Sequence, residues 1–229
     1  MIDAARQGDA ALLRLMQLVS PALPVGAYAY SQGMEHAVHA GWLWDEGSAQ
    51  EWIIGLLQNP LCHVDVPVLV RMYAAWEVDD DAALQRWSAF LGACRESREL
   101  QLEDRQLGTA LARLLRDLKI EEAAPWCAHP HASFAALFAL AAARWRVPVT
   151  AAAQGYLWAW TENQVAAAIK LVPLGQTAGQ RILSQAVAVI PAAAAKGLVL
   201  ADEDIGFVAP RLAIGSALHE DQYSRLFRS

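Results

Sequence analysis

The sequence predicts an all-α fold, a single-domain helical bundle of roughly ten helices. Alanine, leucine and glutamine dominate many stretches while alternating Val, Ile and Thr are scarce, and Ala and Leu lose little rotamer freedom in a helix. Apolar residues recur at helical spacing between prolines that interrupt the pattern. With 229 residues, 55% of them hydrophobic, the chain can bury a core without disulfides or metal, and one domain is simpler than two small ones packed closely.

The first helix is predicted to begin near Asp9 and to stop before Pro21, because the apolar residues between them keep a helical spacing. An extended connector follows, since the next residues include prolines and Gly26. Ser31 can then cap a helix that runs to Gly41.

Ser48 and Glu51 have the spacing of a capping box, which predicts a short helix that ends at Asn59, before a proline. The next helix is expected to start at Asp65. An acidic run at residues 79–81 predicts the start of another, because carboxylates are favourable at the positive end of the helix dipole.

Charges crowd between residues 95 and 105, and the helical pattern carries through them to Leu118, which predicts one long helix bent near Ser97. Residues 121–131 contain two prolines and are predicted to be a loop, the best candidate for a subdomain boundary. Prolines also delimit the later helices, which are predicted at residues 134–145, 150–172 and 176–190 and just after Pro210.

The net charge of −6 and the pI near 5.5 exclude non-specific nucleic-acid binding, which needs a basic face, and favour a protein partner. The three cysteines form no C-x-x-C pair, so neither a disulfide framework nor a zinc knuckle is predicted and a reducing cytoplasm fits. The amino-terminal residues do not resemble a signal peptide, and the longest apolar runs look too short to span a bilayer, so no membrane association is predicted.

The sequence does not favour an enzyme. It contains no G-x-S-x-G, P-loop or G-x-G-x-x-G motif, so hydrolytic, nucleotide-hydrolysing and dinucleotide-binding sites lack their usual local scaffolds and no cofactor is expected. The segment CAHPH offers Cys127, His129 and His131 as metal ligands. Three ligands on one proline-containing loop do not close a tetrahedral site, so they remain weak candidates and no metal site is predicted.

The segment SRELQLEDRQLG brings five charged side chains close together on one predicted helix. Two interpretations are open. Pairs three or four residues apart are typical of a solvated helix face, whereas the same groups could act as an acid, a base or an anion clamp. The solvated face is the more common of the two. The residues concerned are Arg98, Glu99, Glu103, Asp104 and Arg105.

Four ordered segments resemble the UreF family of urease accessory proteins: LLRLMQLVSPALPVGAYAYSQGMEHAVHAGW, CRESRELQLEDRQLG, AAIKLVPLGQ and the closing YSRLFRS. Together they span nearly the whole chain. The first is the most specific, because its prolines, tyrosines and Ser-Gln-Gly occur together in one order. The positions that carry the resemblance are Pro24, Gly26, Tyr30, Ser31, Gln32, Gly33, Arg98, Glu99, Gly175 and Gln176.

The resemblance implies an all-helical, non-catalytic protein that forms a homodimer and joins UreD, called UreH in some organisms. It also implies recruitment of the GTPase UreG to apo-urease, where the assembly inserts nickel in a GTP-dependent step. Two roles follow. The chain is a scaffold, or it is a GTPase-activating regulator of UreG in the strict sense, with Lys170 or an arginine entering the nucleotide site.

The resemblance also assigns partner-binding residues. Lys170 matches a lysine that the family links to UreG regulation, although a lone lysine there is otherwise a snorkelling side chain. Residues 219–229 have too few apolar groups to fold alone, so they are expected to form a flexible tail that orders on a partner. The tail residues that match the family's terminal motif are Tyr223, Arg225, Leu226, Phe227 and Arg228.

Overall fold

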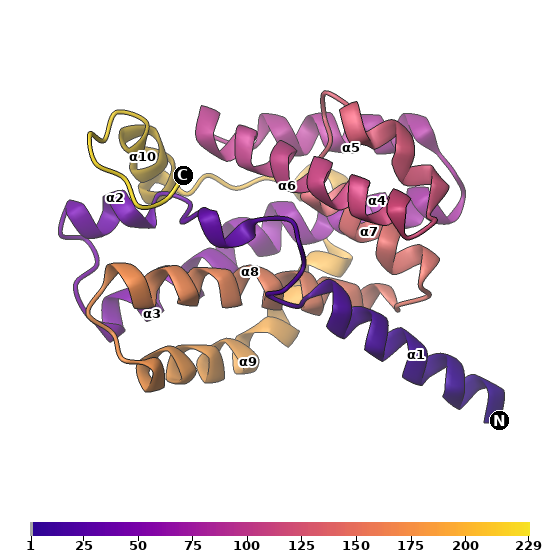
Figure 1. The fold of residues 1–229 in the computed structure, drawn as a ribbon, viewed down its shortest axis with the longest axis horizontal. Coiled ribbons are helices and arrows are strands. Elements are labelled where there is room, and N and C mark those ends of the chain that lie inside the picture. Colours follow the sequence, from indigo (N-terminus) through magenta and orange to yellow (C-terminus); the bar gives the residue numbers. More distant parts are fainter. Residues whose placement is uncertain (1) are drawn as a thin grey trace.

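The computed structural model describes residues 2–229, and every regular element in this range is helical (Figure 1). The predicted all-α class with roughly ten helices is confirmed. The α-helices are α1 (Ile2–Leu18), α2 (Met34–His39), α3 (Glu46–Leu56), α4 (Val66–Glu77), α5 (Asp81–Ala93), α6 (Arg98–Asp117), α7 (Phe134–Arg144), α8 (Val149–Leu171), α9 (Gln176–Val199) and α10 (Pro210–His219). Short 3-10 or π segments are η1 (Ala27–Ala29), η2 (Leu57–Asp65), η3 (Glu121–Ala128) and η4 (Asp202–Asp204).

Two apolar clusters hold these helices together. The larger one gathers around Met72 of α4 and Phe138 of α7, and the amino-terminal half of α8 packs against it. The smaller one lies where α2, α3 and the carboxyl-terminal half of α8 meet α9, around Met34, Ile53 and Ile182. In Figure 1, α1 extends away from the body at one end, and α10 and the chain's carboxyl terminus lie beside α2 at the other.

Helices α2 and α10 pack together through a close approach of their backbones. Gly33 precedes α2 with a φ of +75°, and a Cβ atom there would lie 2.7 Å from the backbone nitrogen of Ser216 in α10. A side chain at this position would therefore be strained and would also push α10 away. Ser97 Oγ, at the start of α6, lies 2.6 Å from Ser216 Oγ, so α2, α6 and α10 converge at one place.

The helix predicted to end at Asn59 instead continues without a break. Residues Leu57–Asp65 form wide π turns that lead directly into α4. Pro60 cannot donate a backbone hydrogen bond, but Asn59 Nδ2 donates to the Gly55 carbonyl oxygen at 2.7 Å and supplies a donor in the same turn. The predicted capping box is also wrong: Asp45, not Ser48, is the N-cap, and Ser48 is its partner.

Two helices replace the single bent helix that was expected across residues 95–105. Helix α5 ends at Ala93, and Ser97 caps α6 by accepting a hydrogen bond from the Leu100 amide at 3.1 Å. Residues 121–131 do not form a boundary loop either. They include the helical segment η3, where Trp126 is buried with its ring 5.7 Å from that of Trp76 in the larger core.

Helix α9 was predicted to end before Pro191 but continues through it to Val199. The carbonyl four residues earlier belongs to Val187, which is exposed, so water can satisfy it. As a result two helical stretches, Glu46–Glu77 and Gln176–Val199, are long and apolar enough to cross a bilayer by length and composition, contrary to the expected short runs. Both pack against other helices here, and buried core helices pass the same test.

Candidate docking site around the carboxyl-terminal tail

The buried carboxylate of Glu35 in α2 binds the backbone of the tail. Its Oε1 accepts a hydrogen bond from the Leu226 amide at 2.7 Å, and its Oε2 accepts one from the Phe227 amide at 2.8 Å. The Phe227 ring is buried in the smaller core. Charge-assisted bonds to a buried carboxylate are stronger than neutral ones, so the tail is docked in this structure rather than free, in contrast to the expected flexible segment.

A buried imidazole connects the two carboxylates behind the tail. His219, at the end of α10, lies with Nδ1 2.7 Å from Glu99 Oε2 and Nε2 3.3 Å from Glu35 Oε2. Arg225 of the tail adds a cationic partner, 2.7 Å from Glu99 Oε1. The tail is therefore attached to α6 as well as to α2.

The last residues are fixed by the connector between α1 and α2. The main-chain oxygen of Ser229 accepts hydrogen bonds from the amide and the hydroxyl of Ser31, at 2.8 and 2.5 Å. The Arg228 amide donates to the Ala29 oxygen at 2.8 Å. Ser229 Oγ donates to Glu103 Oε2 at 2.6 Å, so α6 contributes a second buried carboxylate to this site.

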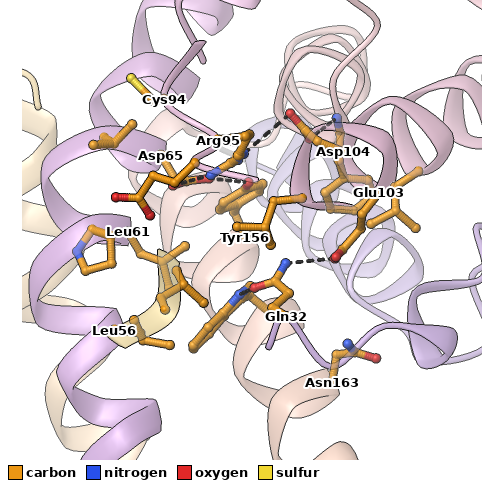
Figure 2. Close-up of a pocket in the computed structure, with 18 of the residues that line it drawn as sticks. Gln32, Leu56, Leu61, Asp65, Cys94, Arg95, Glu103, Asp104, Tyr156 and Asn163 are labelled. Atoms are coloured by element: carbon orange, nitrogen blue, oxygen red, sulfur yellow. Dashed lines mark hydrogen bonds and ion pairs between the residues drawn. The ribbon is translucent and has the colours of Figure 1, made fainter. Parts of the chain in front are cut away.

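Glu103 links the tail to a small internal cavity (Figure 2). Its Oε1 accepts a hydrogen bond from Gln32 Nε2 at 2.7 Å, and Gln32 Oε1 accepts one from the Trp160 indole at 2.7 Å. Burial raises the pKa of Glu103 to about 7, against the opposing effects of the hydrogen bonds from Ser229 and Gln32. This carboxyl group therefore changes charge near neutral pH.

The far side of the cavity is a charged network. The cavity has a volume of about 120 Å³, and Arg95 lies between Asp65 and Asp104 on its wall (Figure 2). Arg95 Nη2 is 2.6 Å from Asp65 Oδ1, its Nε is 3.7 Å from Asp104 Oδ2, and the Tyr156 hydroxyl donates to Asp65 at 3.0 Å. Burial raises the pKa of Asp104, although Arg95 opposes this. The network connects η2, α6 and α8.

Glu103 makes the free energy of unfolding depend on pH. A carboxyl group whose folded pKa is about 7, against an ordinary 4.5, holds its proton more tightly when folded. Its contribution is therefore complete below pH 4.5 and is lost as the pH rises through 7. We expect Glu103→Gln, which stays neutral, to lose less stability between pH 5 and 8 than the wild type in urea unfolding. Its amide oxygen can still accept the Gln32 bond, and its NH2 group can donate to the Ser229 hydroxyl in place of the bond that Glu103 accepts. Parallel curves for the two proteins would contradict this assignment.

The structure places one predicted partner-binding residue, Lys170, next to the tail that carries the others. Lys170, in the last turn of α8, is exposed and its Nζ lies 5.5 Å from the centre of the Phe227 ring. Tyr223 and Leu226 are also exposed, with relative accessible surfaces of 105% and 66% for the whole residue. Arg225 is already paired with Glu99 of the same chain, so it is not free for a partner carboxylate.

The other motif positions mainly shape this end of the molecule. Gln32 and Ser31 contact the tail or its carboxylates, as described above. Gly26 has a φ of +81° and precedes η1, and Pro24 lies in the same connector. The Tyr30 hydroxyl donates to Gln106 of α6. Gly175 is the N-cap of α9 and Gln176 its first residue, away from the carboxylates that hold the tail.

The weak metal candidates form no ligand set in the described residues. Cys127 Sγ lies 3.7 Å from the Ala123 oxygen, in a contact within η3. The His129 ring lies tilted against that of Trp126, with the ring centres 4.6 Å apart, and its Nδ1 accepts a hydrogen bond from the His131 amide at 3.2 Å. No group of three His, Cys, Asp or Glu side chains in the described part of the chain could hold a metal ion.

Sequence reasoning missed the carboxylates that build the site. Glu103 and Asp104 were interpreted as part of a solvated helix face, but both are buried. They lie three and four residues after Leu100 and before the buried Leu107, so helical spacing places them on the apolar side of α6. That spacing was a usable signal. No local pattern marked Glu35 and His219, because these residues are 184 positions apart in sequence and meet only in the fold.

Comparisons with known proteins identify the family of this chain. The UreF family model matches residues 43–187. A urease accessory protein UreF from Alkalilimnicola ehrlichii is 56% identical over 94% of this chain and 95% of its own length. Proteins of the same name from Teredinibacter turnerae and Hahella chejuensis are 50% and 47% identical, over 95% and 96% of this chain and 98% of their own lengths. The chain thus belongs to the UreF family of urease accessory proteins.

Proposed function

We propose that this chain is a non-catalytic scaffold for urease maturation. In this proposal it acts in the cytoplasm as a homodimer, binds UreD (UreH), and recruits the GTPase UreG to apo-urease for GTP-dependent insertion of nickel. Nickel is the cargo of the assembly and not a resident cofactor of this chain. Family membership and the full-length similarity to urease accessory proteins support the role in maturation.

The docked tail is the observation that carries the partner-binding part of the proposal. Its backbone is held from behind by Glu35 and Ser31, while Tyr223 and Leu226 project apolar area into solvent. Large exposed aromatic and aliphatic groups are typical anchors of protein interfaces. Because the segment is ordered before it meets a partner, less conformational entropy is lost on binding. The surface formed by Lys170, Tyr223 and Leu226 is therefore suited to bind a protein.

Co-purification with UreD and UreG, followed by urease activation in cells that lack the native chain, tests this proposal. We expect the double variant Tyr223→Ala/Leu226→Ala to capture the partners at least about tenfold less well, since interface anchors each contribute a few kcal/mol. Val78→Ala is a matched control, because Val78 is equally exposed on a different part of the surface. Normal capture by the double variant would refute the assignment of this surface.

The strict GTPase-activating role is the second candidate, favoured by the exposed ammonium group of Lys170 beside the tail. The two roles differ in one measurement. A GTPase activator increases the rate of GTP turnover by isolated UreG in the absence of urease, whereas a scaffold leaves that rate unchanged and acts only in the complete assembly. Single-turnover measurements with UreG alone and with UreG plus this chain separate them.

We expect Lys170→Ala to keep the fold and to reduce coupling to UreG. The buried neighbours Ala167 and Ala168 supply the packing in this turn, and the cation–π contact with Phe227 contributes only about 0.5–1 kcal/mol at an exposed site. Circular dichroism and urease activation measure the two effects. Lys196→Ala, an exposed lysine on α9, is the control. A misfolded Lys170→Ala protein, or one that activates urease normally, would contradict the prediction.

A further inference from the structure

A second and larger cavity has no tail residue among those that line it. It has a volume of about 560 Å³ and opens between α5, the amino-terminal half of α6 and the segment that precedes α7. Of its lining residues, Asp104 also reaches the cavity of Figure 2. The polar side chains on its walls are Ser88, Arg98, Gln101, Asp104, Arg105, His131 and Ser133.

The walls of this cavity are cationic, although the chain as a whole carries a net charge of −6. Arg98 and Arg105 are exposed and lie seven residues apart on α6, which places them on the same face about 10 Å apart along the helix. Neither forms an ion pair with the described residues. The lining carboxylate, Asp104, faces Arg95 and accepts the Phe134 amide at 3.0 Å, so its charge is already compensated.

We propose that this cavity binds a polyvalent oxyanion, a function separate from the scaffold role. Guanidinium groups bind phosphate and carboxylate oxygens through paired N–H donors. The separation of Arg98 and Arg105 suits a ligand with more than one anionic group better than a single phosphate. His131 and Gln101 add polar contacts at the cavity walls.

Calorimetric titration of the full chain at fixed ionic strength tests the proposal. Pyrophosphate is the probe with two linked phosphate groups, and inorganic phosphate is the comparison with one. We expect one pyrophosphate per chain, bound more tightly than phosphate. The double variant Arg98→Gln/Arg105→Gln should weaken pyrophosphate binding at least about tenfold, because it removes both charge-assisted contacts. Arg113→Gln/Arg211→Gln removes the same charge from exposed arginines outside the cavity and should change binding less than about twofold.

The proposal is overturned if millimolar pyrophosphate does not bind, or if the control double variant loses as much affinity as the cavity variant.

Discussion

Replacement of Arg95 by Met is expected to lower the free energy of unfolding by about 3–5 kcal/mol, the usual effect of removing one partner from a buried ion pair. The guanidinium group lies between two carboxylates whose side chains are only 3% (Asp65) and 11% (Asp104) exposed. Without it, both acids must either remain charged in a poorly solvated place or take up a proton. Urea unfolding at pH 7 measures the loss.

The control for this experiment removes the whole network. The triple variant Asp65→Asn/Arg95→Met/Asp104→Asn leaves no uncompensated charge, so it should recover most of the stability that Arg95→Met loses. Asn at position 65 also retains an oxygen that can accept the Tyr156 hydroxyl. A cost below about 1 kcal/mol for Arg95→Met would show that water already solvates these carboxylates, as at surface ion pairs.

Deletion of the tail after Asp221 is expected to abolish urease activation and also to destabilise the chain. The deletion exposes the pocket that holds the Phe227 ring, and Glu35 loses both backbone donors. Together these effects should lower the free energy of unfolding by about 3 kcal/mol or more, and thus the unfolding temperature by about 6–12 °C. The helical signal should remain, because residues 2–221 retain every α-helix.

Thermal unfolding and partner capture test separate parts of this prediction. An unchanged unfolding temperature would show that the tail is not docked in solution. A lowered temperature with normal activation would show that docking is structural and that partners bind elsewhere. Tyr223→Ala/Leu226→Ala provides the matched comparison, because it removes exposed side chains and leaves the hydrogen bonds to Glu35 in place.

Sequence reasoning predicted the helices well and the boundaries between them poorly. Apolar spacing located the four central helices α4, α7, α8 and α9, because that spacing is a property of each segment alone. The errors concern residues whose effect depends on context. Pro191 was expected to end a helix, yet the residue four positions earlier, Val187, is exposed, and Pro60 lies where Asn59 supplies a donor in the same turn. Neither compensation is visible in local sequence.

The site was predictable only in part. The resemblance identified the tail and Lys170, which the structure brings into contact, but no local pattern indicated what holds the tail in place. Glu35 and His219 belong to helices that are far apart in sequence, and a buried carboxylate is recognised as an anchor only when its donors are seen. Residues that act through tertiary contacts leave little trace in composition or periodicity.

The contact between Ser31 and Ser229 joins residues that are 198 positions apart. Closing so long a loop adds little free-energy cost, since the entropy grows only with the logarithm of length. Its consequence lies in timing. During synthesis α2 and α6 leave the ribosome long before residues 222–229, so the contacts that hold this segment form only after all ten α-helices have been made. A chain that stops before residue 222 would possess these helices but not the contacts with Glu35 and Ser31.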